Sequence, residues 1–220
     1  MIRLDRILDL VFPRKCVLCG AVLGLQEMGI CGQCLTGVPR HSGPDKRIPG
    51  IDAVAAVWYY EDSVRESLHR YKFYGKDTYA EPYGQLLAEA VSRRLSGMDM
   101  VTWVPVSSKR KRERGYDQAE LLAKSVARHL GVPARGTLEK IRHNEAQSGL
   151  RDAKSRRENV RGAYRISSGD AVSGKRILLV DDILTTGATA GECASELRKA
   201  GAACVMLGVV AAGREKRFNE

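Results

Sequence analysis

The 220-residue sequence contains no apolar run near the roughly 20 residues that a membrane-spanning helix needs. Its opening stretch, MIRLDRILDLVF, carries four charged residues and so lacks the apolar centre of a secretion signal. Internal repeats and low-complexity tracts are also absent. We therefore expect a cytoplasmic protein without membrane insertion, whose first residues form a short amphipathic helix that ends at Pro13.

Acidic residues are scarce in one part of the chain. Residues 107–165 contain sixteen basic and seven acidic side chains, a net +9 out of +10 for the whole sequence. Positive charge concentrated in this way favours a polyanionic partner such as phosphate, pyrophosphate or nucleic acid. The hydrophobic fraction of 44% and the charged fraction of 28% are typical of a folded globular protein, and the length suits one domain or one domain with a small appendage.

Cysteine is also limited to six residues, and four of them form the pattern C-x2-C-x11-C-x2-C: Cys16, Cys19, Cys31 and Cys34. Two CxxC turns supply the four thiolates that a tetrahedral structural Zn²⁺ requires. A single CxxC is also typical of a redox pair, which is the alternative. We expect an N-terminal helix and zinc-binding unit over residues 1–45, stabilised by its metal because so short a unit has little core. Cys193 and Cys204 are expected to be buried, inert thiols.

The remaining sequence alternates between strand-like and helix-like segments. Strands are predicted at 52–60, 100–106, 176–180 and 203–212, and helices at 62–73, 79–95, 116–131 and 189–201. The basic segment 142–161 has no clear period and is predicted to be a loop, or a strand pair joined by one. The alternation predicts an α/β domain over residues 51–220, with a parallel sheet flanked by helices, after a linker at 41–50.

The stretch ILLVDDILTTGATA, residues 177–190, places two acids and a Thr-Gly turn directly after a buried strand. Ligands bind at the carboxyl edge of such sheets, and the free N–H groups where a helix begins favour phosphate. Asp181 and Asp182 suit the hydroxyls of a sugar, directly or through Mg²⁺. The loop residues suit the phosphate: Thr185, Thr186, Gly187, Ala188 and Thr189. The combination indicates a ribose 5-phosphate site.

This stretch resembles the phosphoribosyl-pyrophosphate (PRPP) motif of type I phosphoribosyltransferases. Paired acids also follow a strand in receiver domains, but there they lie near the start of the chain and no TTGAT follows. The threonines would alternatively only cap the helix. The resemblance implies a catalytic role for Asp181 and Asp182.

A phosphoribosyl site also needs a place for pyrophosphate. The predicted strand 101–106 ends in small residues before a basic cluster, and its candidate residues are Val106, Ser107, Ser108 and Lys109. Segment 142–162 would match the flexible loop that closes over PRPP in the resembling enzymes, with Gln147, Arg156 and Asn159 as its candidates. The alternatives are a solvated basic loop at 109–114 and non-specific contact with a nucleic-acid backbone at 142–162.

Taken with the four cysteines, these motifs resemble the ComF family, also called competence protein F or the ComFC/GntX type. Its further markers here are YKFYGK, VPV, RGYDQA and RRENVRGAY, which make Lys72 and Arg114 additional candidates. Asp117 departs from the asparagine that is usual in the family. The resemblance implies a role in DNA uptake with a helicase partner. It leaves open a protein that binds single-stranded DNA without catalysis, with PRPP as regulator or not at all.

Overall fold

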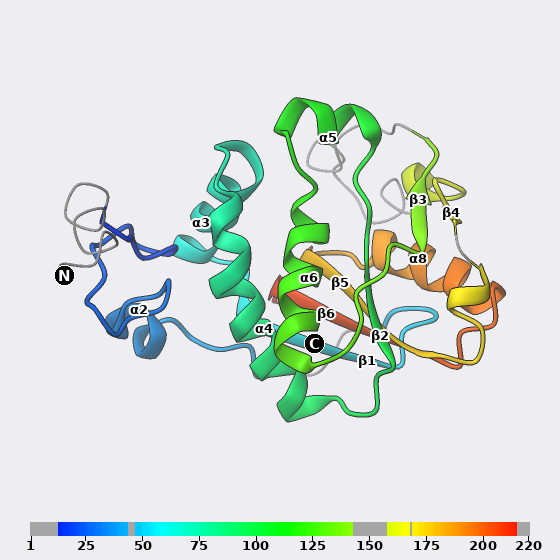
Figure 1. Ribbon diagram of the computed structural model, residues 1–220, viewed down its shortest axis with the longest axis horizontal. Helices are drawn as coiled ribbons and strands as arrows, with labels where there is room; N and C mark the ends of the chain where they lie inside the picture. Colours follow the sequence, from blue (N-terminus) through cyan, green and yellow to red (C-terminus); the bar gives the residue numbers. More distant parts are fainter. Residues whose placement is uncertain (1–12, 44–46, 143–157, 168, 215–220) are drawn as a thin grey trace, which may run out of the picture.

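The computed structural model describes residues 13–43, 47–142, 158–167 and 169–214 (Figure 1). Its centre is a parallel sheet with the strand order β1–β6–β5–β2. These strands are β1 (Ala53–Tyr59), β2 (Met100–Trp103), β5 (Arg176–Leu184) and β6 (Cys204–Ala212). A separate antiparallel pair joins β3 (Leu138–Lys140) to β4 (Tyr164–Ile166). The parallel α/β sheet predicted from the sequence is confirmed.

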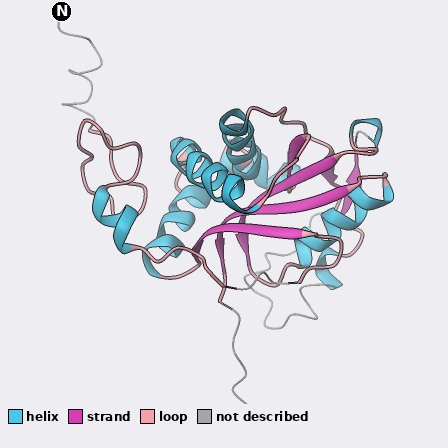
Figure 2. Ribbon diagram, turned by 90° about the horizontal axis from the view of Figure 1, so that it is seen from below, coloured by secondary structure: helices cyan, strands magenta, loops and turns pink. Residues whose placement is uncertain are grey.

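Helices cover both faces of the parallel sheet (Figure 2). Those in the described residues are α2 (Gly32–Gly37), α3 (Asp62–Phe73), α4 (Ala80–Arg94), α5 (Ser108–Arg114), α6 (Gln118–Leu130) and α8 (Ala188–Lys199), with 3-10 turns η1 (Asp77–Tyr79) and η3 (Gly169–Ala171). Leu178 and Val180 of β5 face the core formed with α3, α4 and α6. Ile177 and Leu179 face α8. A strand buried on both faces explains the continuous apolar run in the sequence.

Most element boundaries lie within two residues of the sequence-based prediction, but three segments differ more. β2 ends at Trp103, two residues before Pro105, which lacks the N–H that would continue the ladder. β5 continues beyond Val180 to Leu184, because β6 runs alongside and pairs with Asp181 and Ile183. Residues 108–114, for part of which (109–114) a solvated basic loop was the alternative, form the short helix α5 between Ser107 and the left-handed Gly115.

The four-cysteine unit packs beside α3 and α4 and lies at one end of the molecule (Figure 1). Arg70 of α3 donates hydrogen bonds to the carbonyl oxygens of Val17 and Leu18, at 2.9 and 2.7 Å. Ser67 also donates to the Val17 carbonyl. The first CxxC turn is therefore fixed to the helix that leads into the larger domain. The predicted helix at residues 1–12 lies outside the described residues.

The stretch expected as a linker makes specific contacts where it is described. Directly before it, Arg40 forms an antiparallel bridge with Trp58 of β1. Within it, the His41 N–H donates to the Val57 carbonyl at 2.9 Å. Ile48 is buried and contacts the segment that precedes α8. Within the described part of the chain, no helix is long and apolar enough to cross a membrane.

Candidate functional site

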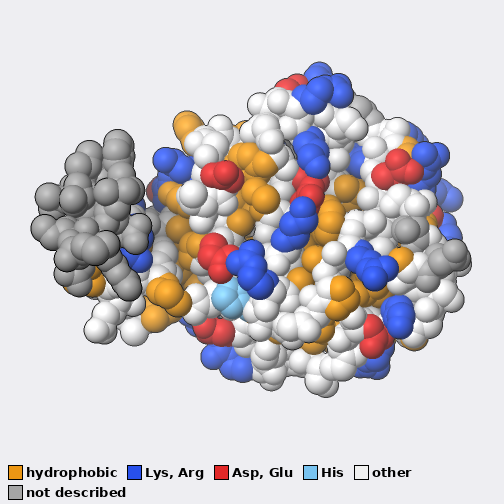
Figure 3. Space-filling model, viewed as in Figure 1, with side chains coloured by type: hydrophobic (Ala, Val, Ile, Leu, Met, Phe, Trp, Pro, Cys, Tyr) orange, Lys and Arg blue, Asp and Glu red, His pale blue; other side chains and the backbone are white. Residues whose placement is uncertain are grey.

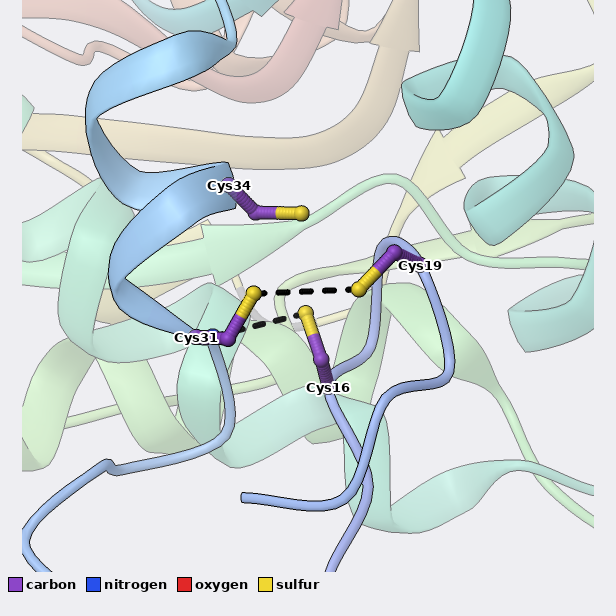
Figure 4. A group of neighbouring side chains, drawn as sticks. All are labelled: Cys16, Cys19, Cys31 and Cys34. Atoms are coloured by element: carbon purple, nitrogen blue, oxygen red, sulfur yellow. Dashed lines mark hydrogen bonds between the residues drawn. The ribbon is translucent and has the colours of Figure 1, made fainter. Parts of the chain in front are cut away.

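The four thiols of the N-terminal unit converge on one point (Figure 4). Their sulfur atoms all lie within 4.8 Å of one another, and Cys19 Sγ lies 3.7 Å from Cys31 Sγ. Four thiolates placed about 2.3 Å from one tetrahedral Zn²⁺ would stand about 3.8 Å apart. The donor set and its spacing fit a structural zinc ion. A simple redox pair does not explain why both CxxC turns meet.

The backbone around these thiols is held by hydrogen bonds. The Cys31 N–H donates to Cys16 Sγ at 3.4 Å. Glu27 accepts from the N–H groups of Gly24 and Gly32, at 2.7 and 2.6 Å, and these bonds lower the pKa of its carboxyl. The pKa of Cys16 is lowered to about 7; burial raises it, but hydrogen bonds from neighbouring backbone and thiol groups outweigh burial. The pKa values of Cys31 and Cys34 are raised instead, with the neighbouring thiols among the causes, so a bound metal ion would have to displace their protons.

A cleft of about 900 Å³ opens at the carboxyl end of the parallel sheet. Its lining includes these residues that the sequence analysis selected: Lys72, Val106, Arg114, Asn159, Asp181, Asp182, Thr185, Thr186, Gly187, Ala188 and Thr189. Ser107, Ser108 and Lys109 lie outside the lining. Gln147 and Arg156 are not among the described residues. Residues from four separate parts of the sequence, around positions 72, 106–114, 159 and 181–189, therefore meet at one edge of the sheet.

The two acids point to opposite sides of β5, because the strand continues through them and successive side chains alternate. Asp182 lies on the side of α3 and α6, where Lys72 Nζ is 3.0 Å from its Oδ1. Asp181 lies on the side of α8, and its carboxylate interacts electrostatically with Lys140 and Tyr164. The cleft wraps around the end of the strand, so both acids still contact the same space.

Asp182 is 3% exposed and takes part in a chain of polar contacts. Gln118 Nε2 donates to Asp182 Oδ2 at 3.4 Å, and Arg114 donates to Gln118 Oε1 at 2.8 Å. The backbone carbonyl of Gln118 accepts a hydrogen bond from Tyr71 at 2.6 Å. The Asp182 carboxylate is thus held between the Lys72 ammonium group and the Gln118 side-chain amide, and Arg114 contacts this amide from the other side.

Asp181 has a pKa well above its ordinary value. Burial is the main cause, and the negative charge of Asp182 adds to it, whereas Lys72 opposes it. Its Oδ1 accepts the N–H of Asp182 at 2.8 Å. Lys140 stands over the Tyr164 ring, 5.2 Å from the centroid, and burial lowers the pKa of this lysine. This side of the cleft therefore combines a carboxyl that resists ionisation with an amine that loses its proton more readily.

The Thr-Gly loop connects β5 to α8 in a conformation that depends on Gly187. This residue has φ +80°, which favours glycine, and a Cβ there would lie 2.9 Å from Ile48 Cγ1. The closest neighbour on that side is thus the buried Ile48, so both the backbone conformation and the packing of this isoleucine require a glycine here. Thr186 Oγ1 accepts the Ala188 N–H at 3.3 Å, so one threonine does support the start of the helix.

Asp117 connects the end of the second strand segment to α6. One carboxylate oxygen accepts from the N–H groups of Ala119 and Glu120, at 3.0 and 3.2 Å, and the other accepts from Val106 at 3.0 Å. The Val106 amide, expected at the pyrophosphate, is therefore bonded to this side chain. An asparagine has only one acceptor oxygen and could not make all three bonds, which gives the departure from the family pattern a structural consequence.

Sequence reasoning did not select several residues of the lining: Arg110, Gln118, Lys140 and Tyr164. Gln118 stands in the RGYDQA motif, so a signal for it was present. Arg110 belongs to the basic cluster of residues 109–114, but only the turn of α5 shows which of its members faces the cleft. Lys140 reaches the site because β3 pairs with β4, a contact between segments 24 residues apart at the Lys140–Tyr164 pair.

Comparison with known proteins agrees with this architecture. Residues 117–220 match the phosphoribosyl transferase domain family, and residues 7–44 match the double zinc ribbon domain family. The fold and the two sites thus define a phosphoribosyltransferase-type domain that carries an N-terminal zinc ribbon.

Three curated proteins are similar to this chain over most or part of their length. The chain is 28% identical to Competence protein F of Haemophilus influenzae over 214 residues, which cover 86% of this chain and 93% of the relative. It is 29% identical to DNA utilization protein YhgH of Salmonella typhi over 222 residues, covering 90% and 96%. It is 31% identical to Competence protein ComFC of Bacillus subtilis over 150 residues, covering 66% and 59%. The chain is therefore similar to competence and DNA utilization proteins, which agrees with the resemblance to the ComF family noted in the sequence.

Proposed function

We propose that this protein binds PRPP in the cleft and transfers its 5-phosphoribosyl group to an acceptor, with release of pyrophosphate. The observation that carries the proposal is the convergence of an acidic pair, a Thr-Gly loop and several cations on one cleft. In the transfer, the bond from the ribose C1 to pyrophosphate breaks and a bond from C1 to the acceptor nucleophile forms. Pyrophosphate leaves with the bonding electron pair.

Each part of the cleft has a role in this proposal. The loop Thr185–Thr189 holds the 5-phosphate at the start of α8. Asp181 and Asp182 hold the ribose hydroxyls, directly or through Mg²⁺. Pyrophosphate lies toward Lys72, Arg110 and Arg114, whose charge stabilises the leaving group. The zinc ribbon is structural. The proposal also includes a division of the chain into units 1–45 and 51–220 and a cytoplasmic location. It further assigns a contribution to the site to Gln147, Arg156 and Asn159.

Calorimetric titration with PRPP and Mg²⁺ tests this assignment. Wild type is expected to bind, and the double variant Asp181→Ala, Asp182→Ala is expected to release no measurable heat. Glu89→Ala serves as the matched control, because Glu89 is an exposed acid on α4 whose contact is with Arg93 at 3.8 Å. Equal binding by wild type and the double variant would refute the site. Pyrophosphate release with a panel of candidate acceptors then tests catalysis.

A second candidate function is a single-stranded DNA-binding factor that uses PRPP as a regulator or not at all. It is favoured by the exposed cations of α5 and by the names of relatives that refer to competence and DNA utilization. Against it, Lys111 and Lys124 both pair with Glu120, at 2.9 and 2.7 Å, which neutralises part of this surface. Figure 3 shows acidic side chains among the basic ones on this face. The helicase partner implied by the family stays a prediction.

The salt dependence of DNA binding separates the two candidates. A DNA-binding surface on α5 predicts a steep loss of affinity with salt and a smaller slope after Lys109→Ala. The phosphoribosyl proposal predicts PRPP binding that tolerates this substitution, because Lys109 lies outside the cleft lining.

A further inference from the structure

A second cavity, of about 580 Å³, adjoins the cleft at the end of α3. Its lining consists of Tyr60, Arg65, Glu66, His69, Arg70, Tyr74 and Lys76. Tyr60 and His69 also line the cleft, so the two spaces share a wall. A ligand whose sugar phosphate occupies the cleft can therefore extend a further group toward this cavity. Its volume lies in the range of about 300–1,000 Å³ that is usual for small-molecule sites.

Aromatic side chains gather at this wall. Phe73 and Tyr74 are 58% and 65% exposed, although large aromatic side chains are normally buried. The His69 ring lies 4.7 Å from the Phe73 ring and 5.8 Å from the Tyr74 ring. We refer to His69, Phe73 and Tyr74 as the aromatic platform. The Arg114 guanidinium stands 4.9 Å from the Phe73 centroid, so a planar group already stacks on one member of this platform.

The charge around the platform favours an electron-rich or anionic ligand. Three basic residues and one acidic residue line the second cavity. Arg70 is engaged with the Val17 and Leu18 carbonyls, whereas Arg65 and Lys76 are exposed. The aromatics inside the basic segment itself are committed elsewhere: Tyr164 is buried, and Tyr116 donates to the Tyr71 carbonyl. Stacking surface and positive charge therefore coincide at the end of α3.

We propose that the aromatic platform binds a nucleobase. A base stacked there would lie beside the cleft, where the acceptor of the proposed phosphoribosyl transfer must approach C1; in this respect the inference rests on the proposed function. The base has two chemical sources, a free base or nucleoside and a base of a single-stranded nucleic acid. Both present the same planar ring, and aromatic stacking with nearby cations recognises it without regard to sequence.

The test substitutes Tyr74, which lines the second cavity and not the cleft, so that PRPP binding can be followed separately. Tyr74→Ala removes the stacking surface, and Tyr74→Phe retains it as the matched control. The first probe is a fluorescent oligothymidylate of about twelve nucleotides, within the length that such sites cover. An abasic oligodeoxynucleotide of equal length carries the same phosphates without bases. The second probe is a set of free nucleosides, followed by saturation-transfer NMR.

Base stacking predicts that Tyr74→Ala weakens binding of the base-bearing probe roughly 5- to 150-fold for each base that loses its partner. Tyr74→Phe is expected to stay within about two-fold of wild type, because the ring that supplies the stacking remains. The abasic strand should bind more weakly and be insensitive to both substitutions. Dependence on Tyr74 in the oligonucleotide arm identifies a nucleic acid as the source, and the same dependence in the nucleoside arm alone identifies a small ligand.

Two outcomes would overturn the inference. One is that neither probe binds wild type. The other is that Tyr74→Ala binds every probe as wild type does. Titration with PRPP separates failure of this inference from failure of the proposed function. If wild type binds nucleosides but not PRPP, the aromatic platform is supported and the phosphoribosyl site is refuted.

Discussion

Removing Lys72 from its ion pair with Asp182 is predicted to lower the free energy of unfolding more than removing the charge of Asp182 does. Lys72 Nζ lies 3.0 Å from Asp182 Oδ1, and the two side chains are 23% and 4% exposed. At this distance the gross attraction is about 5 kcal/mol for an effective dielectric constant of about 20, and loss of hydration offsets much of it. Removing one partner of a fully buried pair costs about 3–5 kcal/mol. Because this pair borders an open cleft, we expect Lys72→Met to cost about 2–3 kcal/mol.

The reverse substitution should cost less. In Asp182→Asn the carboxylate charge is gone, and the lysine that remains can turn its ammonium group into the cleft while its carbon chain stays packed. We therefore expect Asp182→Asn to cost less than about 1 kcal/mol. The double variant should resemble Asp182→Asn, because no unpaired carboxylate remains in it. The coupling free energy between the two positions should then equal the cost of Lys72→Met in magnitude, about 2–3 kcal/mol.

Urea unfolding of wild type, both single variants and the double variant measures these four free energies. Arg93→Met on α4 is the matched control, because it removes a cation whose contact with Glu89 is exposed and 3.8 Å long. This control should change stability by less than about 0.5 kcal/mol. Equal costs for Lys72→Met and Asp182→Asn, or a larger cost for Asp182→Asn, would refute the reasoning that burial of the carboxylate dominates.

Three further predictions concern single residues of the site. Asp117→Ala should lower the free energy of unfolding by about 2–4 kcal/mol in urea titration, because it removes the cap of α6 and the bond to Val106, and Asp117→Asn should cost less because its amide oxygen retains the cap. Gly187→Ala should lower the free energy of unfolding by at least about 1–2 kcal/mol in the same titration, because φ is +80° and Ile48 occupies the space of the new methyl group. Adding Ile48→Ala to this variant should recover part of the lost stability. Asp181→Asn should raise the thermal midpoint of unfolding at neutral pH, because the pKa of Asp181 is higher in the folded than in the unfolded protein and its ionisation therefore destabilises the fold. This destabilisation grows as the pH rises from the ordinary aspartate pKa of about 4 through the raised folded pKa. Below about pH 4 the carboxyl is protonated in both states, so the variant and wild type should then unfold at the same temperature. A variant no more stable than wild type across the pH series would contradict this assignment.

Local sequence predicted those features whose cause is local. The spacing of the cysteines predicted the four-thiol cluster because two CxxC turns can each present two sulfurs to one ion. The helix 116–131 was close to α6, which ends at the left-handed Gly131 as the glycine indicated. For α5 the signals were present in Ser107 and Gly115, but no helix was predicted there, and a solvated basic loop was left as an alternative for residues 109–114. The Ser107 cap and the Lys109–Glu113 pair at helical spacing account for the helix.

Features set by distant partners were not predictable in this way. The acids after Val180 suggested that the strand stops there, yet β6 continues beside it and supplies pairing partners up to Ala212. Extension of the strand in turn decides that Asp181 and Asp182 point to opposite sides. The pairing of Lys72 with Asp182 joins residues 110 positions apart, and the approach of Lys140 depends on the β3–β4 pairing. Sequence motifs marked Lys72 without indicating what it contacts.

Helix α3 connects the two sites through residues on adjacent turns. Ser67 and Arg70 bind the carbonyl groups of the first CxxC turn, and Lys72, two residues farther on, binds Asp182. The aromatic platform occupies the same end of this helix. A zinc ion held by Cys16, Cys19, Cys31 and Cys34 would order residues 16–19 and, through these hydrogen bonds, would also restrain the helix that supplies Lys72 to the cleft. Helix α3 therefore couples the zinc ribbon to the cleft, because one face of the helix is hydrogen-bonded to the ribbon and another faces the site.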